Sequence, residues 1–308
     1  FKKFMNAKEQ IIGGEKKTVF EKPVSIKLEN VSFLYGAGTA YCKEALKNVN
    51  IEIKEGSITG LIGHTGSGKS TMLQLLNGLS TPSEGKVYLD GVDIWEKPKE
   101  IGKVRFRVGL VMQYPEYQLF EETVYKDIAF GPKNMGLSKE EIDRRVREAA
   151  GFVGLSESQL QVSPFDLSGG QKRRVAIAGV IAMEPEVLIL DEPTAGLDPV
   201  GREEILSNIQ AYRQAKNATI MMVSHSMNDV ARMASRLLVM YDAHLAMDGT
   251  PMEVFNRAQE MLDMGLDIPE ITRVFLRLQQ MGLPVNQVYT MEQAVAELKR
   301  LKGGAVNA

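Results

Sequence analysis

Cysteine is almost absent from this chain of 308 residues, since Cys42 is the only one. A single cysteine excludes an internal disulfide and fits a reducing compartment. Long apolar runs are missing as well, and none approaches the roughly 18 residues that a membrane-spanning helix needs. The lysine-rich start lacks the apolar core of a signal peptide. We therefore expect no membrane-spanning helix, while binding to a membrane surface stays open.

An excess of charge of one sign is also missing, because the formal net charge is only −2. No global field therefore attracts the chain to nucleic acid, and we expect no nucleic-acid partner. Hydrophobic residues make up 44% of the chain, which is enough for a sizeable core. The length predicts about two domains, or one large core with an appendage.

What the chain does contain is a glycine-rich loop, GHTGSGKST, at residues 63–71. It matches G-x-x-x-x-G-K-[ST] and lies between an apolar run typical of a buried strand and a run typical of a helix. Glycines let the backbone approach a polyphosphate, while N–H groups and the helix N-terminus point at the anion. Lys69 supplies charge for the β- and γ-phosphates, and Ser70 is placed to ligate Mg²⁺. The predicted phosphate-binding residues are Gly63, His64, Thr65, Gly66, Ser67, Gly68, Lys69, Ser70 and Thr71.

A second pattern is an apolar run, residues 187–190, that ends in Asp191 and Glu192. The run fits a parallel strand buried on both faces, and the carboxyl end of such a strand is where α/β sheets bind ligands. Asp191 is placed to hold Mg²⁺ through water, and Glu192 to orient and deprotonate the attacking water. Another buried strand, 219–223, ends next to His225. His225 is either a structural residue or a γ-phosphate contact, and its place on the same sheet favours the contact.

Two aromatic residues, Phe33 and Tyr35, lie upstream of the glycine-rich loop. The segment 25–31 alternates apolar and polar residues, which predicts a half-buried strand, and 45–53 is its expected antiparallel companion. An aromatic side chain between them can stack on a purine base. From the residues alone, either aromatic fits this role, and both can equally be ordinary strand-end residues.

Helix signals mark the middle of the chain. Ser138 predicts a helix start with Glu141 as its partner in a capping box. Ser168 is a good N-cap for a helix running to Met183, and the two glycines after it leave a bare N-terminus suited to an anion. Apolar residues at helical spacing then recur beyond residue 255, in two predicted helices. They are Ile271, Val274, Phe275, Leu278 and Met281 in the first, and Met291, Ala294, Val295, Leu298 and Leu301 in the second. These helices are expected to pack on the main domain or on another subunit.

Taken together, GHTGSGKST, Gln113, LSGGQ, VLILDE, AGLD and VSH, in this order, resemble the ATP-binding cassette (ABC) ATPase family. The resemblance implies an α/β fold, a RecA-like P-loop nucleotide-binding domain with an antiparallel β subdomain. It places the ATPase domain at residues 25–254, including a helical subdomain at about 113–183. Residues 255–308 become a C-terminal helical extension for subunit contact. Residues 1–24 lie before the region of resemblance. Because they are lysine-rich and unpatterned, we expect a flexible leader or a remnant of recombinant expression, with a partner-binding arm as the alternative.

The resemblance also implies roles for individual residues. Tyr35 matches the adenine-stacking aromatic, in preference to Phe33. Gln113 matches the glutamine that contacts Mg²⁺ and reports the nucleotide state to the helical subdomain. The implied catalytic residues are Glu192, His225 and Gln113, and the implied Mg²⁺ ligands are Ser70, Gln113 and Asp191. ATP and Mg²⁺ are the implied cofactors.

Cassettes of this family work as head-to-tail pairs. The signature residues Ser168, Gly169, Gly170 and Gln171 would therefore contact ATP bound to the partner, and Asp198 matches the aspartate of the D-loop. ATP joins the pair and hydrolysis releases it, which is a two-state change biased by a ligand. The chain departs from the family at none of the catalytic positions, so we expect its site to hydrolyse ATP.

A closer resemblance is to the ATPases of energy-coupling factor (ECF) transporters, which take up vitamins and transition-metal ions into prokaryotic cells. It rests on GHTGSGKST, on the run YPEYQLFEETVYKDIAFGPKN at 114–134, on SPFDLSGGQKRRVAIAGV and on the two-helix tail. The chain is more similar to the second ATPase of the heterodimeric type. This implies a second ATPase subunit, a transmembrane coupling protein and a small substrate-binding membrane protein as partners. It also implies a peripheral position on the cytoplasmic face of the cell membrane.

The loop after Gln113 is the candidate contact with the membrane partner. Aromatic residues beside acids form a groove able to take an amphipathic helix that carries arginine. The predicted dock for a cytoplasmic coupling helix consists of Glu116, Tyr117, Gln118 and Phe120. Two other functions share the catalytic motifs, namely the ATPase of a conventional ABC importer and a soluble assembly ATPase, for instance in iron–sulfur cluster biogenesis. The sequence names neither the transported substrate nor whether the dimer is homo- or heteromeric.

Overall fold

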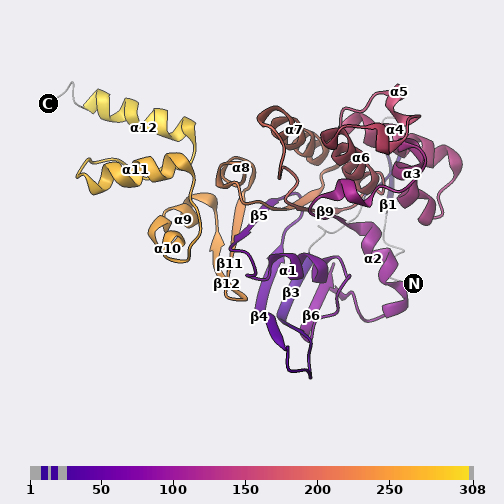
Figure 1. Ribbon diagram of the computed structural model, residues 1–308, viewed down its shortest axis with the longest axis horizontal. Helices are drawn as coiled ribbons and strands as arrows, with labels where there is room; N and C mark the ends of the chain where they lie inside the picture. The colour runs from indigo at the N-terminus through magenta and orange to yellow at the C-terminus, as the bar shows by residue number, and fades with distance from the viewer. Residues whose placement is uncertain (1–7, 13–14, 20–25, 305–308) are drawn as a thin grey trace.

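The main sheet has six strands in the order β12-β11-β5-β10-β9-β8 (Figure 1). The structure is a computed structural model, and it describes residues 8–12, 15–19 and 26–304. Neighbouring strands are parallel except for the antiparallel pair β11–β12. The strands are β5 (Ile58–Gly63), β8 (Val108–Val111), β9 (Val187–Asp191), β10 (Thr219–Val223), β11 (Arg236–Tyr241) and β12 (His244–Gly249). Every residue of β5 and β10 is buried, as expected for parallel strands covered on both faces. The predicted α/β fold is confirmed.

The second sheet is antiparallel and has the order β4-β3-β6-β7. Its strands are β3 (Ile26–Tyr35), β4 (Lys43–Ile53), β6 (Glu84–Leu89) and β7 (Val92–Asp93). Helix α1 (Lys69–Leu76) joins the two sheets, because Met72 belongs to one hydrophobic cluster with Leu28 of β3 and Val223 of β10. This packing fixes the start of α1, where the glycine-rich loop ends, against both sheets. Strand β3 pairs antiparallel with β4, so the predicted pairing of the segments 25–31 and 45–53 is confirmed.

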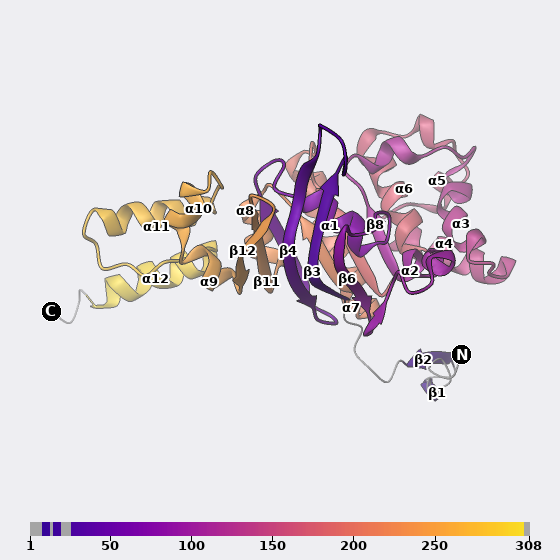
Figure 2. The ribbon, with the colours of Figure 1, turned by 90° about the horizontal axis from the view of Figure 1, so that it is seen from below.

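A group of helices lies at one end of the main sheet (Figure 2). It consists of α3 (Val124–Asn134), α4 (Lys139–Phe152), α5 (Glu157–Leu160) and α6 (Gly169–Ile181), with the 3-10 turns η3 (Pro115–Gln118) and η4 (Pro164–Asp166). The preceding link contains η2 (Pro98–Glu100) and α2 (Ile101–Arg107). Ile142 and Val146 of α4 are buried, as their helical spacing predicts. These helices occupy the stretch expected to form the helical subdomain.

The capping prediction at the start of α4 is only half correct. Ser138 does cap the helix, since its hydroxyl accepts the N–H of Glu141 at 3.2 Å. The Glu141 carboxylate does not return to Ser138 but accepts hydrogen bonds from Arg144 and Arg145. Two guanidinium partners offer a carboxylate stronger, charge-assisted bonds than one backbone N–H does. At the other end of this group, α6 stops at Ile181, two residues before the predicted end.

The remaining helices are α7 (Pro199–Lys216) and α8 (Met227–Met233) beside the sheet, followed by α9 (Pro251–Phe255), α10 (Ala258–Asp263), α11 (Glu270–Gln280) and α12 (Met291–Gly304). Figures 1 and 2 show α11 and α12 side by side at the far end of the molecule. Phe275 and Ala294 share a small core there with Val285 and Val288. Ile271, Leu278 and Leu301 are partly buried against this core. The other residues of the predicted apolar stripes are exposed, namely Val274, Met281, Met291, Val295 and Leu298. Mutual packing of the two helices therefore uses only part of each stripe.

The N-terminal segment contains two strands that the sequence did not predict. β1 (Lys8–Ile12) pairs antiparallel with β2 (Glu15–Val19). The other residues of the expected leader, 1–7, 13–14 and 20–24, lie outside the described residues, so its interpretation stays a prediction. Across the described ranges, none of the helices has the length and apolar character required to span a membrane.

Candidate nucleotide-binding site

The glycine-rich loop connects β5 to α1 as the sequence predicts. Gly68 is the N-cap of α1 and has φ +101°, in the region that favours glycine. The Lys69 ammonium donates hydrogen bonds to the carbonyl oxygens of Gly63 at 2.8 Å and His64 at 3.0 Å. Burial lowers the pKa of Lys69, while the charges of Glu192 and Asp191 act in the opposite direction. Phosphate oxygens would offer this ammonium stronger, charge-assisted bonds than two carbonyls do.

Two glycines of the loop differ in what a side chain would meet, which makes a testable pair. A Cβ at Gly68 would lie 2.3 Å from the carbonyl oxygen of Ala45, whereas at Gly66, with φ +83°, it would meet nothing within 4 Å. Gly66→Ala should cost about 1 kcal/mol of folding free energy, from backbone strain alone. Gly68→Ala should cost about 3 kcal/mol or more, because overpacking is added. Denaturant unfolding without nucleotide measures both, and equal losses would contradict this reading of the loop.

The side chains expected to bind Mg²⁺ meet where α1 starts and β9 ends. The Ser70 hydroxyl donates to the Asp191 carboxylate at 3.2 Å. Burial raises the pKa of Asp191, and the hydrogen bond from Ser70 opposes that rise. Among the described residues, no group of three or more His, Cys, Asp or Glu side chains is placed to hold a metal ion. A hydroxyl and one carboxylate beside a phosphate loop nevertheless fit Mg²⁺, which binds oxygen and takes its other ligands from phosphates and water.

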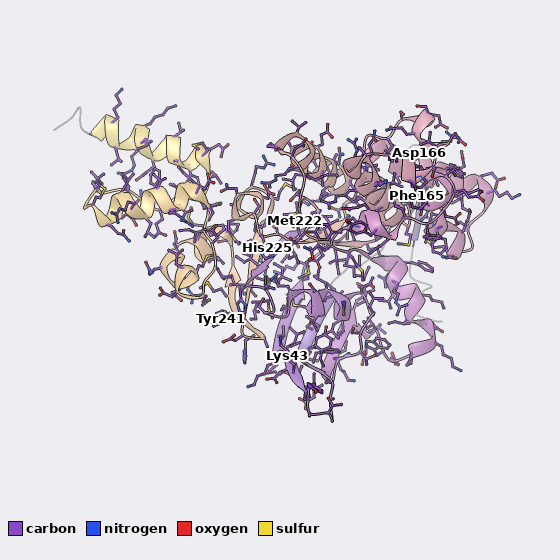
Figure 3. The ribbon with its side chains drawn as sticks, viewed as in Figure 1. Lys43, Phe165, Asp166, Met222, His225 and Tyr241 are labelled. Carbon is purple, nitrogen blue, oxygen red and sulfur yellow. The ribbon has the colours of Figure 1, made fainter. Side chains whose placement is uncertain are left out.

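The three predicted catalytic side chains, Gln113, Glu192 and His225, converge beyond the ends of β8, β9 and β10. The Glu192 carboxylate lies 2.8 Å from Nε2 of His225, and it accepts a 3.4 Å hydrogen bond from the Gln113 amide. Figure 3 labels His225 just past Met222 of β10. The register explains the convergence, because Val223 pairs with Asp191 and both strands therefore end at the same level.

Glu192 also has an unusual backbone that sequence analysis did not foresee. Its φ is +52°, a conformation that non-glycine residues rarely adopt, and its N–H donates to the carbonyl of Val223 at 3.0 Å. Strained residues of this kind cluster at functional sites. The Glu192 side chain is mostly buried and the His225 side chain is half exposed. The pair therefore lies at the surface of the sheet edge, with the carboxylate on the inner side.

The structure also separates the two candidate aromatics. Phe33 packs on the hydrophobic core, whereas Tyr35 is exposed and its hydroxyl lies 3.1 Å from that of Thr71 in the phosphate loop. The Phe33 and Tyr35 rings form a T-shaped contact with centroids 4.8 Å apart, and Tyr35 remains 44% exposed. This arrangement favours Tyr35 as the residue that stacks on adenine.

His64 contributes to the loop mainly through its backbone. Its ring contacts the ring of Tyr241 edge-on at 5.3 Å, and Nε2 lies 3.9 Å from the carboxylate of Asp242. Tyr241, which Figure 3 labels, is the last residue of β11, and Asp242 begins the turn to β12. The His64 side chain therefore packs against that turn, while its carbonyl holds Lys69.

The signature residues lie at the start of α6. Ser168 and Gln171 form a complete capping box, with hydrogen bonds of 3.3 Å and 2.9 Å. Over the ranges described, no hydrogen bond joins Ser168, Gly169, Gly170 or Gln171 to the phosphate loop of the same chain. The adjacent Phe165 and Asp166 are exposed (Figure 3). Asp198 is likewise exposed and caps α7, accepting the N–H of Gly201 at 2.7 Å.

The predicted dock is exposed except at one residue. Tyr117 is 84% exposed, Phe120 is 58% exposed, and Gln118 is exposed as well. Glu116 instead forms a bidentate ion pair with Arg173 of α6, at 2.9 and 3.1 Å. Its carboxylate is therefore already bonded within the chain. Sequence analysis missed Arg173, because it lies between Lys172 and Arg174 in a run of basic residues that looks like a solvated face.

Comparison with known proteins agrees with this geometry. The family model described as ABC transporter matches residues 46–195. The energy-coupling factor transporter ATP-binding protein EcfA2 of Caldanaerobacter subterraneus is 52% identical over 283 residues, covering 92% of this chain and 99% of the relative. The protein of the same name from Clostridium tetani is 52% identical over 280 residues, covering 90% and 97%.

Solved structures show the same relationship in three dimensions. The cbiO1 protein from Clostridium perfringens, part of the ABC transporter complex cbiONQ, has a TM-score of 0.70 and 39% identity, covering 85% of this chain and 98% of that one. A dimeric ATP-binding cassette in a post-hydrolysis state with ADP and Pi has a TM-score of 0.67 and 31% identity, covering 73% and 98%.

Proposed function

This chain belongs to the ATP-binding subunits of energy-coupling factor transporters, within the ABC ATPase family, and from that premise we propose how its residues act. The chain binds and hydrolyses ATP to drive an uptake transporter. We infer that vitamins or transition-metal ions are transported. The observation that carries the mechanism is the convergence of Gln113, Glu192 and His225 beside the Ser70–Asp191 pair.

ATP binds with its phosphates in the loop 63–71 and its adenine on Tyr35. Lys69 leaves its two carbonyl acceptors for the β- and γ-phosphates, and Ser70, Asp191 and Gln113 are the residues that would hold Mg²⁺. Bound Mg²⁺ neutralises charge on the phosphates. The positive Lys69 thus faces the negative phosphates, and the oxygen atoms of Ser70, Asp191 and Gln113 face the site of the cation.

Glu192 orients a water molecule and takes its proton on a carboxylate oxygen while that water attacks the γ-phosphorus. The bond between the γ-phosphorus and the β–γ bridging oxygen breaks as the new bond forms, so ADP leaves with that oxygen and inorganic phosphate is released. His225, at 2.8 Å, and the Gln113 amide, at 3.4 Å, fix the direction of the carboxylate. His225 also faces the γ-phosphate. Because Glu192 is mostly buried, little bulk water competes for its oxygens.

The active unit is a head-to-tail pair with a second ABC ATPase, which we propose to be a different chain. Ser168, Gly169, Gly170 and Gln171 contact the ATP of the partner. Ser168 and Gly169 are exposed, and within the described residues none of the four bonds to this chain's own phosphate loop. Asp198 lies in the loop that faces the partner. The exposed apolar residues of α11 and α12 supply a second contact between the two subunits, since burying them removes apolar surface from water.

A transmembrane coupling protein docks on the exposed loop after Gln113, and a small membrane protein binds the substrate. Tyr117 and Phe120 carry the dock, and Phe120 is supported edge-on by Phe130 at 5.0 Å. The Glu116 carboxylate borders the dock and is shared with Arg173. The chain thus works as a peripheral subunit on the cytoplasmic face of the membrane.

Removing both dock aromatics tests this placement. Tyr117→Ala with Phe120→Ala should weaken assembly with the membrane proteins by about 2 kcal/mol or more, as for buried aromatic anchors of an interface. ATP affinity should not change, because within the described residues the ring contacts of these side chains are with Tyr114 and Phe130, and neither contacts the phosphate loop. Met252→Ala, which truncates an exposed apolar side chain on α9, is the control. Detergent co-purification measures assembly, and full assembly of the double variant would remove these residues from the dock.

The transport assignment itself is tested by tagging this chain, extracting membranes in mild detergent and identifying co-purifying proteins by mass spectrometry. We expect a second, related ATPase and a small set of multi-span proteins. Recovery of the multi-span proteins with an extracellular binding protein would indicate a conventional importer instead. Recovery of soluble partners alone would leave the ATPase chemistry intact and overturn the transport role.

A further inference from the structure

Arg173 connects parts of the site that the catalytic scheme leaves separate. Its side chain is only 3% exposed although it carries a full charge. On one side, Nε and Nη2 bond both oxygens of Glu116, at 3.1 and 2.9 Å. On the other side, Nη1 donates to the carbonyl oxygens of Pro193, at 3.5 Å, and Ala195. One buried guanidinium therefore joins the turn η3 to the segment that directly follows Glu192.

That segment is also held from the opposite side. Between the two carbonyls, the buried Thr194 donates its hydroxyl to the buried carboxylate of Asp229, at 3.2 Å. Asp229 lies in the first turn of α8, whose N-cap Ser226 directly follows His225. The backbone at 193–195 is thus fixed between Arg173 and the helix that follows His225. Any movement of the Arg173 guanidinium must displace this backbone or break its bonds.

We propose that Arg173 is a positioning residue that couples the membrane-side loop to Glu192. A partner that shifts the exposed Tyr117 also shifts Glu116, its neighbour in η3. Glu116 and Arg173 move together, because leaving either charge alone in a buried place is strongly unfavourable. The carbonyls of residues 193 and 195 move with the guanidinium, because they are hydrogen-bonded to it. The carboxylate of Glu192 then changes its direction relative to the attacking water. The inference rests on the proposed role of Glu192 and adds how that role is regulated.

The geometry requires arginine at this position. A guanidinium is planar and presents five donors in a fixed fork, so it can hold a carboxylate on one edge and carbonyls on another. A lysine ammonium keeps the charge but is a single point, and it cannot span Glu116 and both carbonyls together. Arg173→Lys should therefore preserve the buried charge while uncoupling the two sides.

The adjacent residue supplies a matched control. Arg174 also lies on α6 and bonds Glu204 of α7 at 2.7 Å, a pair that is more exposed and touches neither the dock nor the segment after Glu192. Arg174→Lys makes the same replacement, a guanidinium by an ammonium, on the same helix. A loss that comes only from perturbing α6 would therefore appear in both variants.

The test compares both variants in the complex that co-purifies with this chain. Arg173→Lys should lower kcat for ATP hydrolysis about 100-fold, the scale of a misplaced catalytic group, while ATP affinity and melting temperature stay near those of the wild type. Arg174→Lys should retain wild-type kcat. Equal kcat in Arg173→Lys and wild type would overturn the proposal, and so would parallel losses of kcat, ATP affinity and melting temperature.

Glu116→Gln approaches the same link from the dock side and serves if Arg173→Lys fails to fold. It should lower kcat as well, and the double variant should be no slower than the slower single variant, because both break one connection. Additive losses would contradict a shared link. Failure of this inference can be told apart from failure of the proposed function. Wild-type kcat in Glu192→Gln would show that Glu192 is not the base. A low kcat in Glu192→Gln together with wild-type kcat in Arg173→Lys would contradict only this inference.

Discussion

Glu192→Gln should lower ATP turnover by roughly 10²–10⁴, the usual contribution of a positioned general base, while ATP still binds. The amide has almost the same shape as the carboxylate, so the contacts with His225 and Gln113 can persist. It cannot take the proton of the attacking water. Steady-state hydrolysis gives the turnover, and equilibrium binding of ATP gives the affinity. Because hydrolysis releases the pair, size-exclusion chromatography with ATP should also show the variant trapped as the closed dimer.

The control variant is Glu186→Gln. Glu186 precedes β9, whereas Glu192 follows it, and Glu186 pairs with Arg107. Glu186→Gln also removes one carboxylate charge, but at the opposite end of β9, and it should leave turnover close to that of the wild type. If the two variants hydrolyse ATP at equal rates, Glu192 is not the base.

Lys69→Ala should weaken ATP binding by roughly 10- to 100-fold, the value of a hydrogen bond to a charged group. The ammonium is buried, and burial lowers its pKa, so the nucleotide-free chain holds this charge at a cost that the phosphates offset. Isothermal titration with a non-hydrolysable ATP analogue measures the affinity.

Lys103→Ala is the matched control for this change, because Lys103 is exposed on α2 and, within the part of the chain that the structure describes, pairs with Glu100 alone. Its replacement should leave the affinity for the ATP analogue as in the wild type. Unchanged affinity in Lys69→Ala as well would count against the phosphate-loop assignment.

Local patterns predicted most of the fold because each depends on near neighbours in the chain. Apolar runs mark β5, β9 and β10, since parallel strands covered on both faces need no alternation. The predicted N-cap Ser168 does cap α6, because that role depends only on the N–H of Gln171, three positions along the chain. At α4, Glu141 prefers two arginines to the box, a choice that depends on competing partners.

Tertiary contacts account for what the sequence could not predict. Apolar stripes on the last two helices do not show that Phe275 and Ala294 face each other while Val274 and Leu298 stay exposed. A basic run around Arg173 reads as a solvated surface until α6 packs on η3 and buries the guanidinium. Likewise, the paired acids ending β9 predict a catalytic site but not the left-handed backbone of Glu192. Each of these features depends on elements far apart in the sequence.

The most direct test of the account is uptake by the purified complex in sealed vesicles. With ATP supplied on the side where this chain is bound, the wild-type complex should hydrolyse ATP and accumulate the transported substrate. The complex carrying Glu192→Gln should do both far more slowly, and by similar factors. Uptake at the wild-type rate despite a loss of hydrolysis would contradict the claim that ATP hydrolysis at this site powers transport.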